Sequence, residues 1–153
     1  MSSIGQVRLA YRLLVKQAQA CLDARYRPNF VPKLRIIAPD PAHFPAPRNF
    51  AFCYTDTGDI TIADDLLDHP RDRWEAILQH EIGHAFEFFL TRELGKREGL
   101  ATLAIIPGVR GSGPERRADA VAEYIFGDPI SYDAEDVQTL GPGTRPRPLR
   151  LGK

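Results

Sequence analysis

Apolar residues recur at helical spacing near the N-terminus of the chain. In the segment 2–25 these positions are Ile4, Val7, Tyr11, Leu14, Ala18 and Leu22. Steps of three and four residues place such side chains on one face of a helix. Basic residues at Arg8, Arg12 and Lys16 interrupt the segment. The pattern therefore predicts an amphipathic helix, and neither a signal peptide nor a membrane span.

Three short segments after this helix favour β-structure. Residues 33–38 (KLRIIA) alternate in polarity, and residues 50–55 (FAFCYT) and 59–63 (DITIA) are rich in aromatic and β-branched residues. The sequence DTG at 56–58 supplies turn chemistry between the last two segments, which predicts a β-hairpin. We expect a small, mostly antiparallel three-stranded sheet.

Proline and glycine mark the boundaries of two further helices. A periodic pattern over 70–94 follows a possible cap at Asp68 and stops at Gly95. A second helix over 114–126 begins at a proline and ends before a Gly-Asp-Pro sequence. Between the two helices, residues 95–113 predict a partly buried connection whose form the pattern does not settle.

The composition fits one domain with a single core. The chain has 153 residues, of which 43% are apolar. We expect a domain over 1–140 and a disordered basic tail rich in proline and glycine over 141–153. Twenty basic residues balance twenty acidic ones, so charge favours neither nucleic acid nor a membrane as a partner. Cys21 and Cys53 form no CxxC pair and are typical of reduced core thiols in a cytoplasmic protein.

The predicted helix 70–94 contains the HExxH motif His80-Glu81-Ile82-Gly83-His84. The spacing of four places both imidazoles on one face about a turn apart, where they can bind one tetrahedral zinc ion. Glu81 lies beside them and can serve as general base towards a zinc-activated water. The residues around the motif are uncharged, as a buried ligand-bearing helix requires. The alternative, two surface histidines on an ordinary helix, fits this pattern poorly.

A catalytic zinc site needs a third protein ligand, and no histidine follows His84. Glu115 is the preferred candidate, because Asp119 follows it by one helical turn. One of these carboxylates can bind zinc while the other supports a ligand histidine. A solvated Glu115 is the plain alternative. Other candidates for the third ligand are Glu87, His43 and His69.

Small residues predict how the two helices that carry this chemistry meet. Ala118 and Ala122 form a stripe on the helix 114–126. With so little side-chain bulk, this helix can pack closely against the HExxH helix at Gly83.

The HExxH motif followed by the ExxAD sequence at 115–119 resembles the gluzincin clan of zinc metallopeptidases, to which thermolysin belongs. The order of elements is similar to that of the minigluzincins and of the compact ImmA/IrrE-type peptidases. The resemblance implies a zincin-like α+β domain in which His80, His84 and Glu115 hold one Zn²⁺ ion and Asp119 supports the first histidine. The strand around 60–62 resembles the substrate-binding edge strand of the clan. No motif marks the oxyanion-stabilising residue, for which the candidates are Tyr124, Tyr132 and Arg110.

We therefore expect a zinc metalloendopeptidase that acts on a peptide or protein substrate. The substrate would pair main chain to main chain with the strand 59–63. One alternative is a zinc-stabilised interaction domain without hydrolytic activity. Glu81 argues against this alternative, because a purely structural zinc site does not need it. Another is a regulatory protease with one dedicated protein substrate.

Overall fold

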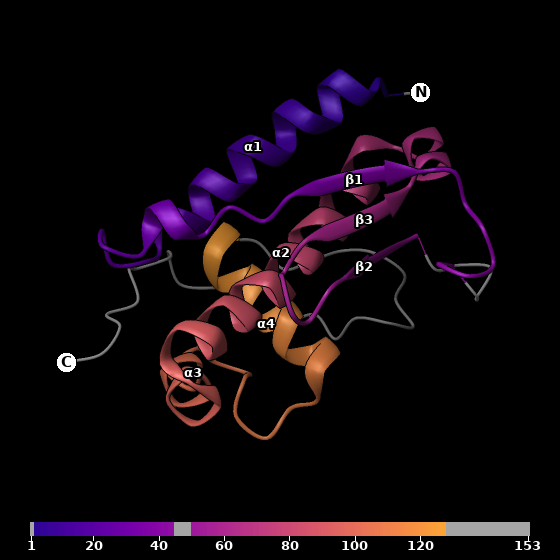
Figure 1. The fold of residues 1–153 in the computed structure, drawn as a ribbon. Helices are drawn as coiled ribbons and strands as arrows, with labels where there is room; N and C mark the ends of the chain where they lie inside the picture. The colour runs from indigo at the N-terminus through magenta and orange to yellow at the C-terminus, as the bar shows by residue number, and fades with distance from the viewer. Residues whose placement is uncertain (1, 45–49, 128–153) are drawn as a thin grey trace.

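Residues 2–44 and 50–127 are described by the structure, which is a computed structural model. In these residues four α-helices accompany a three-stranded sheet (Figure 1). The predicted α+β class is confirmed. The predicted tail 141–153, and the part of the predicted domain after residue 127, lie outside the described residues.

The predicted N-terminal helix is confirmed as α1 (Ile4–Ala20). A capping box opens it: the hydroxyl of Ser3 accepts a hydrogen bond from the Gln6 N–H, and the Gln6 side chain accepts one from the Ser3 N–H. The apolar stripe is buried from the second turn onward, at Val7, Ala10, Tyr11, Leu14, Val15 and Ala18, whereas Ile4 is 52% exposed. Burial of this stripe holds α1 on the domain, because helix propensity alone gives only marginal stability.

The sheet is mixed, so the prediction of a mostly antiparallel sheet is wrong for one of its two pairings. Its strands are β1 (Leu34–Ile37), β2 (Ala51–Cys53) and β3 (Ile60–Ala63), in the order β1-β3-β2. The hairpin pairing of β2 with β3 is antiparallel, whereas β1 pairs with β3 in parallel. A short turn forces its two strands to be antiparallel, but the long connection between β1 and β3 allows these two strands to pair in parallel.

Helix α2 (Arg71–Leu94) lies at the centre of the molecule and contacts the other three α-helices as well as β2 and β3 (Figure 1). The prediction of its extent is confirmed, but the cap at Asp68 is wrong. That residue ends a short 3₁₀-helix (Asp64–Asp68), and Pro70 stands at the N-cap without a side-chain hydrogen bond. The second predicted helix is confirmed as α4 (Pro114–Phe126).

Helix α3 (Lys96–Leu103) lies in the connection whose form the sequence did not predict. It packs against α2 through Gly99. A Cβ atom on Gly99 would lie 2.7 Å from the Thr91 Cα, so no larger residue fits there without a shift of the backbone. A glycine that disfavours an isolated helix is thus required by the tertiary packing.

The core lies between α1, the sheet and α2. Phe30 packs edge to face against Phe86 and Phe89, with ring centroids 5.7 and 5.3 Å apart. Cys21 and Cys53 are free thiols, as predicted. None of the helices in the described ranges has the length and apolar character needed to cross a lipid bilayer.

Candidate metal centre

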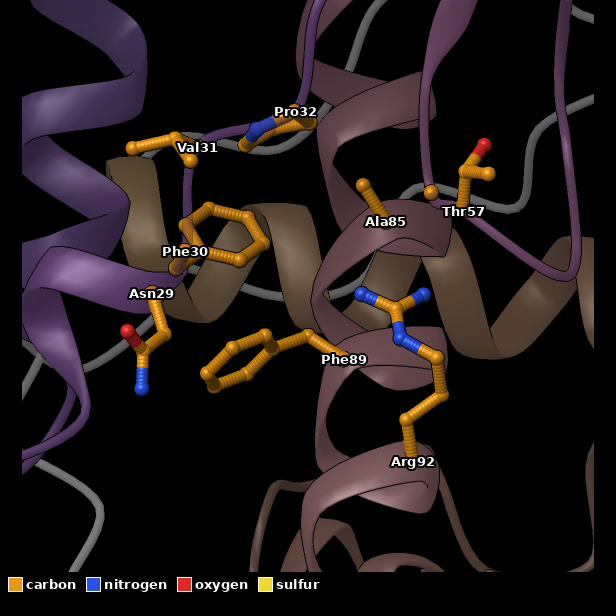
Figure 2. Close-up of a pocket in the computed structure, with 9 residues that line it drawn as sticks. Asn29, Phe30, Val31, Pro32, Thr57, Ala85, Phe89 and Arg92 are labelled. Atoms are coloured by element: carbon orange, nitrogen blue, oxygen red, sulfur yellow. The ribbon is translucent and has the colours of Figure 1, made fainter.

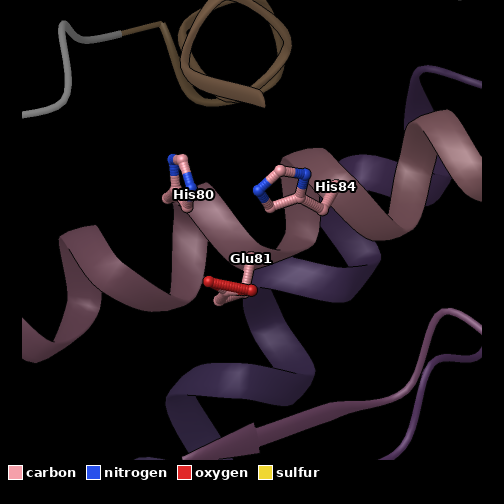
Figure 3. A group of neighbouring side chains, drawn as sticks. All are labelled: His80, Glu81 and His84. Atoms are coloured by element: carbon pink, nitrogen blue, oxygen red, sulfur yellow. The ribbon is translucent and has the colours of Figure 1, made fainter. Parts of the chain in front are cut away.

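The HExxH motif is buried in the middle of α2. His80, Glu81 and His84 are only 7%, 6% and 8% exposed, so the alternative of two surface histidines is wrong. Figure 3 shows both imidazoles on one side of α2 and Glu81 on an adjacent side. The two rings stand perpendicular with centroids 4.7 Å apart. One ligand atom from each of the three residues lies within 4.8 Å of the others, so the group could hold a single metal ion.

Glu115 reaches both histidines from the first turn of α4. Its Oε2 is 2.8 Å from His80 Nε2, and its Oε1 is 3.1 Å from His84 Nε2. Tetrahedral zinc with bonds of about 2.0–2.1 Å to nitrogen and oxygen keeps its ligand atoms roughly 3.3 Å apart. The two histidine–glutamate distances are therefore close to the spacing that such an ion needs. The Glu115 side chain is 76% exposed, so the centre is open to solvent on this side.

Asp119 contacts the other ring nitrogen of His80. Its Oδ1 is 2.6 Å from His80 Nδ1, and both side chains are buried. Nδ1–H donates to Asp119, and in the protonated imidazole Nε2–H donates to Glu115. When the ring loses one proton, the contact with Asp119 keeps the remaining proton on Nδ1 and leaves the Nε2 lone pair available to a metal ion. Such support from a carboxylate fixes the tautomer and increases the basicity of a ligand histidine.

The buried surroundings change the protonation of these groups. Burial alone lowers the pKa of His80, but its hydrogen bonds to Asp119 and Glu115 outweigh burial and raise that pKa to about 10. The hydrogen bonds from His80 and His84 lower the pKa of Glu115. Burial raises the pKa of Glu81, and its Oε2 has no hydrogen-bond partner among the described residues. A buried carboxylate oxygen without a partner is costly, and such groups concentrate at functional sites.

The other candidates for the third ligand, Glu87, His43 and His69, contact residues outside the HExxH motif. Glu87 forms an ion pair with Arg117 through a contact of 2.6 Å. His43 lies with its Nδ1 2.9 Å from the Asp40 carboxylate, and the His69 ring packs edge-on against Phe50. Of the four candidates for a third ligand, Glu115 is the one that the structure brings onto both motif histidines.

Gly83 allows α4 to lie directly against α2. A Cβ atom there would overlap the carbonyl oxygen of Ala118 and would lie 3.0 Å from its carbonyl carbon. The close approach predicted for Ala118 is therefore confirmed. Ala122 packs against Ala76 instead. This contact sets the distance between the helix that carries the histidines and the helix that carries Glu115.

Replacing Gly83 with alanine is expected to destabilise the protein by about 1–3 kcal/mol. The new methyl group meets backbone atoms of α4, which cannot move aside as a flexible side chain could, and this outweighs the better helix propensity of alanine. The matched control is Gly5→Ala in α1, where the nearest atom to the added Cβ is 3.9 Å away. Thermal or urea unfolding of both variants measures the difference. A Gly83→Ala protein as stable as the Gly5→Ala protein would contradict this account of the helix contact.

The strand predicted to bind a substrate does not lie at an edge of the sheet. We predicted that a substrate pairs with the strand 59–63, but β3 is the central strand and has neighbours on both sides. Its backbone groups are already paired, so that prediction is wrong. β2 contacts α2, and its Cys53 lies near Glu81: burial raises the pKa of this thiol, and the charge of Glu81 raises it further.

A separate pocket of about 130 Å³ is lined in part by residues of α2 that follow the HExxH motif in sequence (Figure 2). Phe30, Ala85 and Phe89 line its apolar part, and Arg92 reaches in from the next turn of the helix. The lining includes none of the HExxH residues. This pocket is therefore not a part of the candidate centre.

Fold and site together define an α+β domain with a buried His-Glu-His group that could hold a metal ion. Comparison with protein-family models, with curated proteins and with solved structures gave no match to this chain. Its function must therefore be argued from the residues of the site.

Proposed function

We propose that this protein is a zinc-dependent metalloendopeptidase with a gluzincin-like ligand set. The observation that carries the proposal is the convergence of His80, His84 and Glu115, whose nitrogen and carboxylate donors lie 2.8 and 3.1 Å apart in the two histidine–glutamate contacts. Two histidines and a glutamate form an accepted zinc ligand set, and three protein ligands leave one position open. An open position distinguishes a catalytic zinc site from a closed structural one.

The roles of the chain's own residues follow from their positions. A bound zinc ion would polarise the scissile carbonyl and lower the pKa of water in the open position. Glu81 takes the proton of the attacking water and returns it to the leaving amine. In the zinc-free protein, burial raises the pKa of Glu81. A zinc ion beside it would favour the ionised carboxylate, which is the form that accepts the proton. Asp119 keeps His80 in the tautomer that binds through Nε2.

We propose that β2 aligns the substrate, in place of β3. Phe50 and Tyr54, which flank this strand, bond through their backbone to residues of the β3 side. In an antiparallel pair, the backbone N–H and C=O groups of successive residues point alternately towards the partner strand and away from it. Since those of Phe50 and Tyr54 point towards β3, those of Ala51 and Cys53 point away from it, to the outer edge of the sheet. No neighbouring strand covers this edge of the sheet within the described residues. An extended peptide could pair there, main chain to main chain, beside Glu81.

The test of the proposal is digestion of a diverse peptide mixture by protein of known metal content. We expect about one zinc per chain, cleavage within peptides, loss of cleavage with a chelator, and recovery when zinc is restored. Zinc binding without any chelator-sensitive cleavage would instead support the interaction domain. Cleavage of one partner protein alone would support the dedicated protease.

Glu115→Ala is expected to weaken zinc affinity more than Asp119→Ala. Glu115 contacts both histidines directly, whereas Asp119 acts through His80. Loss of such a supporting carboxylate costs roughly 10- to 100-fold in affinity. Titration against a competing zinc chelator measures both values, with the exposed Arg116→Ala as control. If the zinc affinity of Glu115→Ala equals that of the wild type, Glu115 is not a ligand.

A further inference from the structure

We propose that Arg117 and Glu87 are a positioning pair that sets the orientation of Glu115 towards the two histidines, an inference that rests on the proposed zinc site. The Arg117 guanidinium donates from Nε to Glu87 Oε1 over 2.6 Å and from Nη2 to Oε2 over 3.2 Å. This two-point contact fixes direction as well as distance. The Glu87 side chain is buried and that of Arg117 is 22% exposed, so solvent screens the pair only in part.

The same guanidinium also holds the segment that leads into α4. Its Nη1 donates to the backbone carbonyl of Ser112 over 2.8 Å. Arg117 thus joins three parts of the molecule: α2 at Glu87, the turn before α4, and the first turns of α4 itself. Glu115 belongs to those first turns.

Glu115 depends on the orientation of α4, because little else holds its side chain. It is 76% exposed, and its ion pairs among the described residues are those to His80 and His84. A side chain at the helix surface lies about 5–6 Å from the axis, so a rotation of about 10° moves it by about 1 Å. Metal–ligand distances tolerate only about 0.2 Å. Small rotations of α4 would therefore degrade the site.

Glu115 and Arg117 lie on opposite sides of the line along which α4 touches α2. Residues two apart on a helix are separated by roughly 200° around its axis, and the contact with Gly83 at Ala118 falls between them. The close contact limits how far the helices can move together. The ion pair on one side resists the rotation that would move Glu115 on the other.

Stability alone explains such a pair poorly. Replacing a buried ion pair with apolar residues of similar volume is often neutral or stabilising, because desolvation offsets the attraction. A positioning role predicts that loss of the ion pair lowers the affinity for zinc and leaves the stability of the zinc-free protein almost unchanged.

The experiment measures zinc affinity and zinc-free melting temperature for Arg117→Lys, which keeps the charge and loses the two-point contact. We expect zinc affinity to fall about tenfold, as for other groups that orient a ligand, with a melting temperature within a few degrees of wild type. The matched control is Arg116→Lys, an exposed neighbour on the same helix turn, which should match the wild type. An unchanged zinc affinity in Arg117→Lys would overturn the proposal.

A second background separates positioning from a general effect on the fold. In a Glu115→Ala protein, Arg117→Lys should change zinc affinity less than twofold, since the residue through which it acts is gone. The double variant Glu87→Met/Arg117→Met leaves no unpaired buried charge, so it can be measured even if Arg117→Lys folds poorly. It should show the same tenfold loss of zinc affinity. Equal losses with and without Glu115, or wild-type affinity in the double variant, would refute the inference. Wild-type protein that binds no zinc would refute the proposed function itself, before any variant is made.

Discussion

Replacing Glu81 with glutamine is expected to reduce peptide cleavage by roughly 10²- to 10⁴-fold, the usual contribution of a general base. The amide has the size of the carboxylate but cannot accept the proton of the attacking water. Zinc content should not change, because Glu81 is not among the three proposed ligands. Rates of cleavage of one identified peptide, at matched zinc occupancy, measure the effect.

Glu81→Gln should not lower the stability of the protein, although it lowers the activity. The raised pKa of Glu81 means that its surroundings disfavour the ionised form. Folding therefore becomes less favourable as the pH rises above the ordinary pKa that this carboxyl has in the unfolded chain, and the loss is complete above the raised pKa. In zinc-free protein at neutral pH, Glu81→Gln should therefore unfold at the same temperature as wild type or higher. Glu93→Gln, an exposed position on the same helix, is the matched control and should leave both properties unchanged. Full cleavage activity in Glu81→Gln would remove this residue from the mechanism.

Removing zinc is expected to lower the melting temperature by roughly 8–16 °C when free zinc is 1,000 times above the dissociation constant. Under that condition binding stabilises the folded state by about 4 kcal/mol, and for a domain of about 150 residues each kcal/mol shifts the melting temperature by about 2–4 °C. His80→Ala and His84→Ala should melt without any response to zinc or chelator. Calorimetry or thermal scans at fixed zinc concentration give the comparison.

Two other histidines serve as controls for this prediction. His43 and His69 contact Asp40 and Phe50 in the structure, away from the proposed ligand set. His43→Ala and His69→Ala should keep the full zinc-dependent shift in melting temperature. A zinc response that survives in His80→Ala and His84→Ala, or that disappears in His43→Ala, would place the metal elsewhere.

Local patterns were sufficient for the features that depend on neighbours in sequence. The apolar stripe of α1, the extents of α2 and α4, and the face shared by His80 and His84 all follow from periodicity over a few residues. The burial of the motif was also predictable, because its flanking residues carry no charge. These properties reside in single helices, where the geometry of 3.6 residues per turn links spacing directly to position.

Only the tertiary structure decided the features that join distant segments. The strand patterns of β1 and β3 did not reveal that they pair in parallel, because strand order depends on contacts between residues far apart in sequence. Helix α3 was missed because Gly99 disfavours a helix locally and is needed only against α2. Glu87 and Glu115 were both candidate ligands by spacing, and their contacts in the structure distinguish them. Glu87 forms an ion pair with Arg117, whereas Glu115 contacts the two motif imidazoles. Such choices arise where two helices meet, since the rotation of one against the other is set by packing at the interface and not by the periodicity of either chain segment.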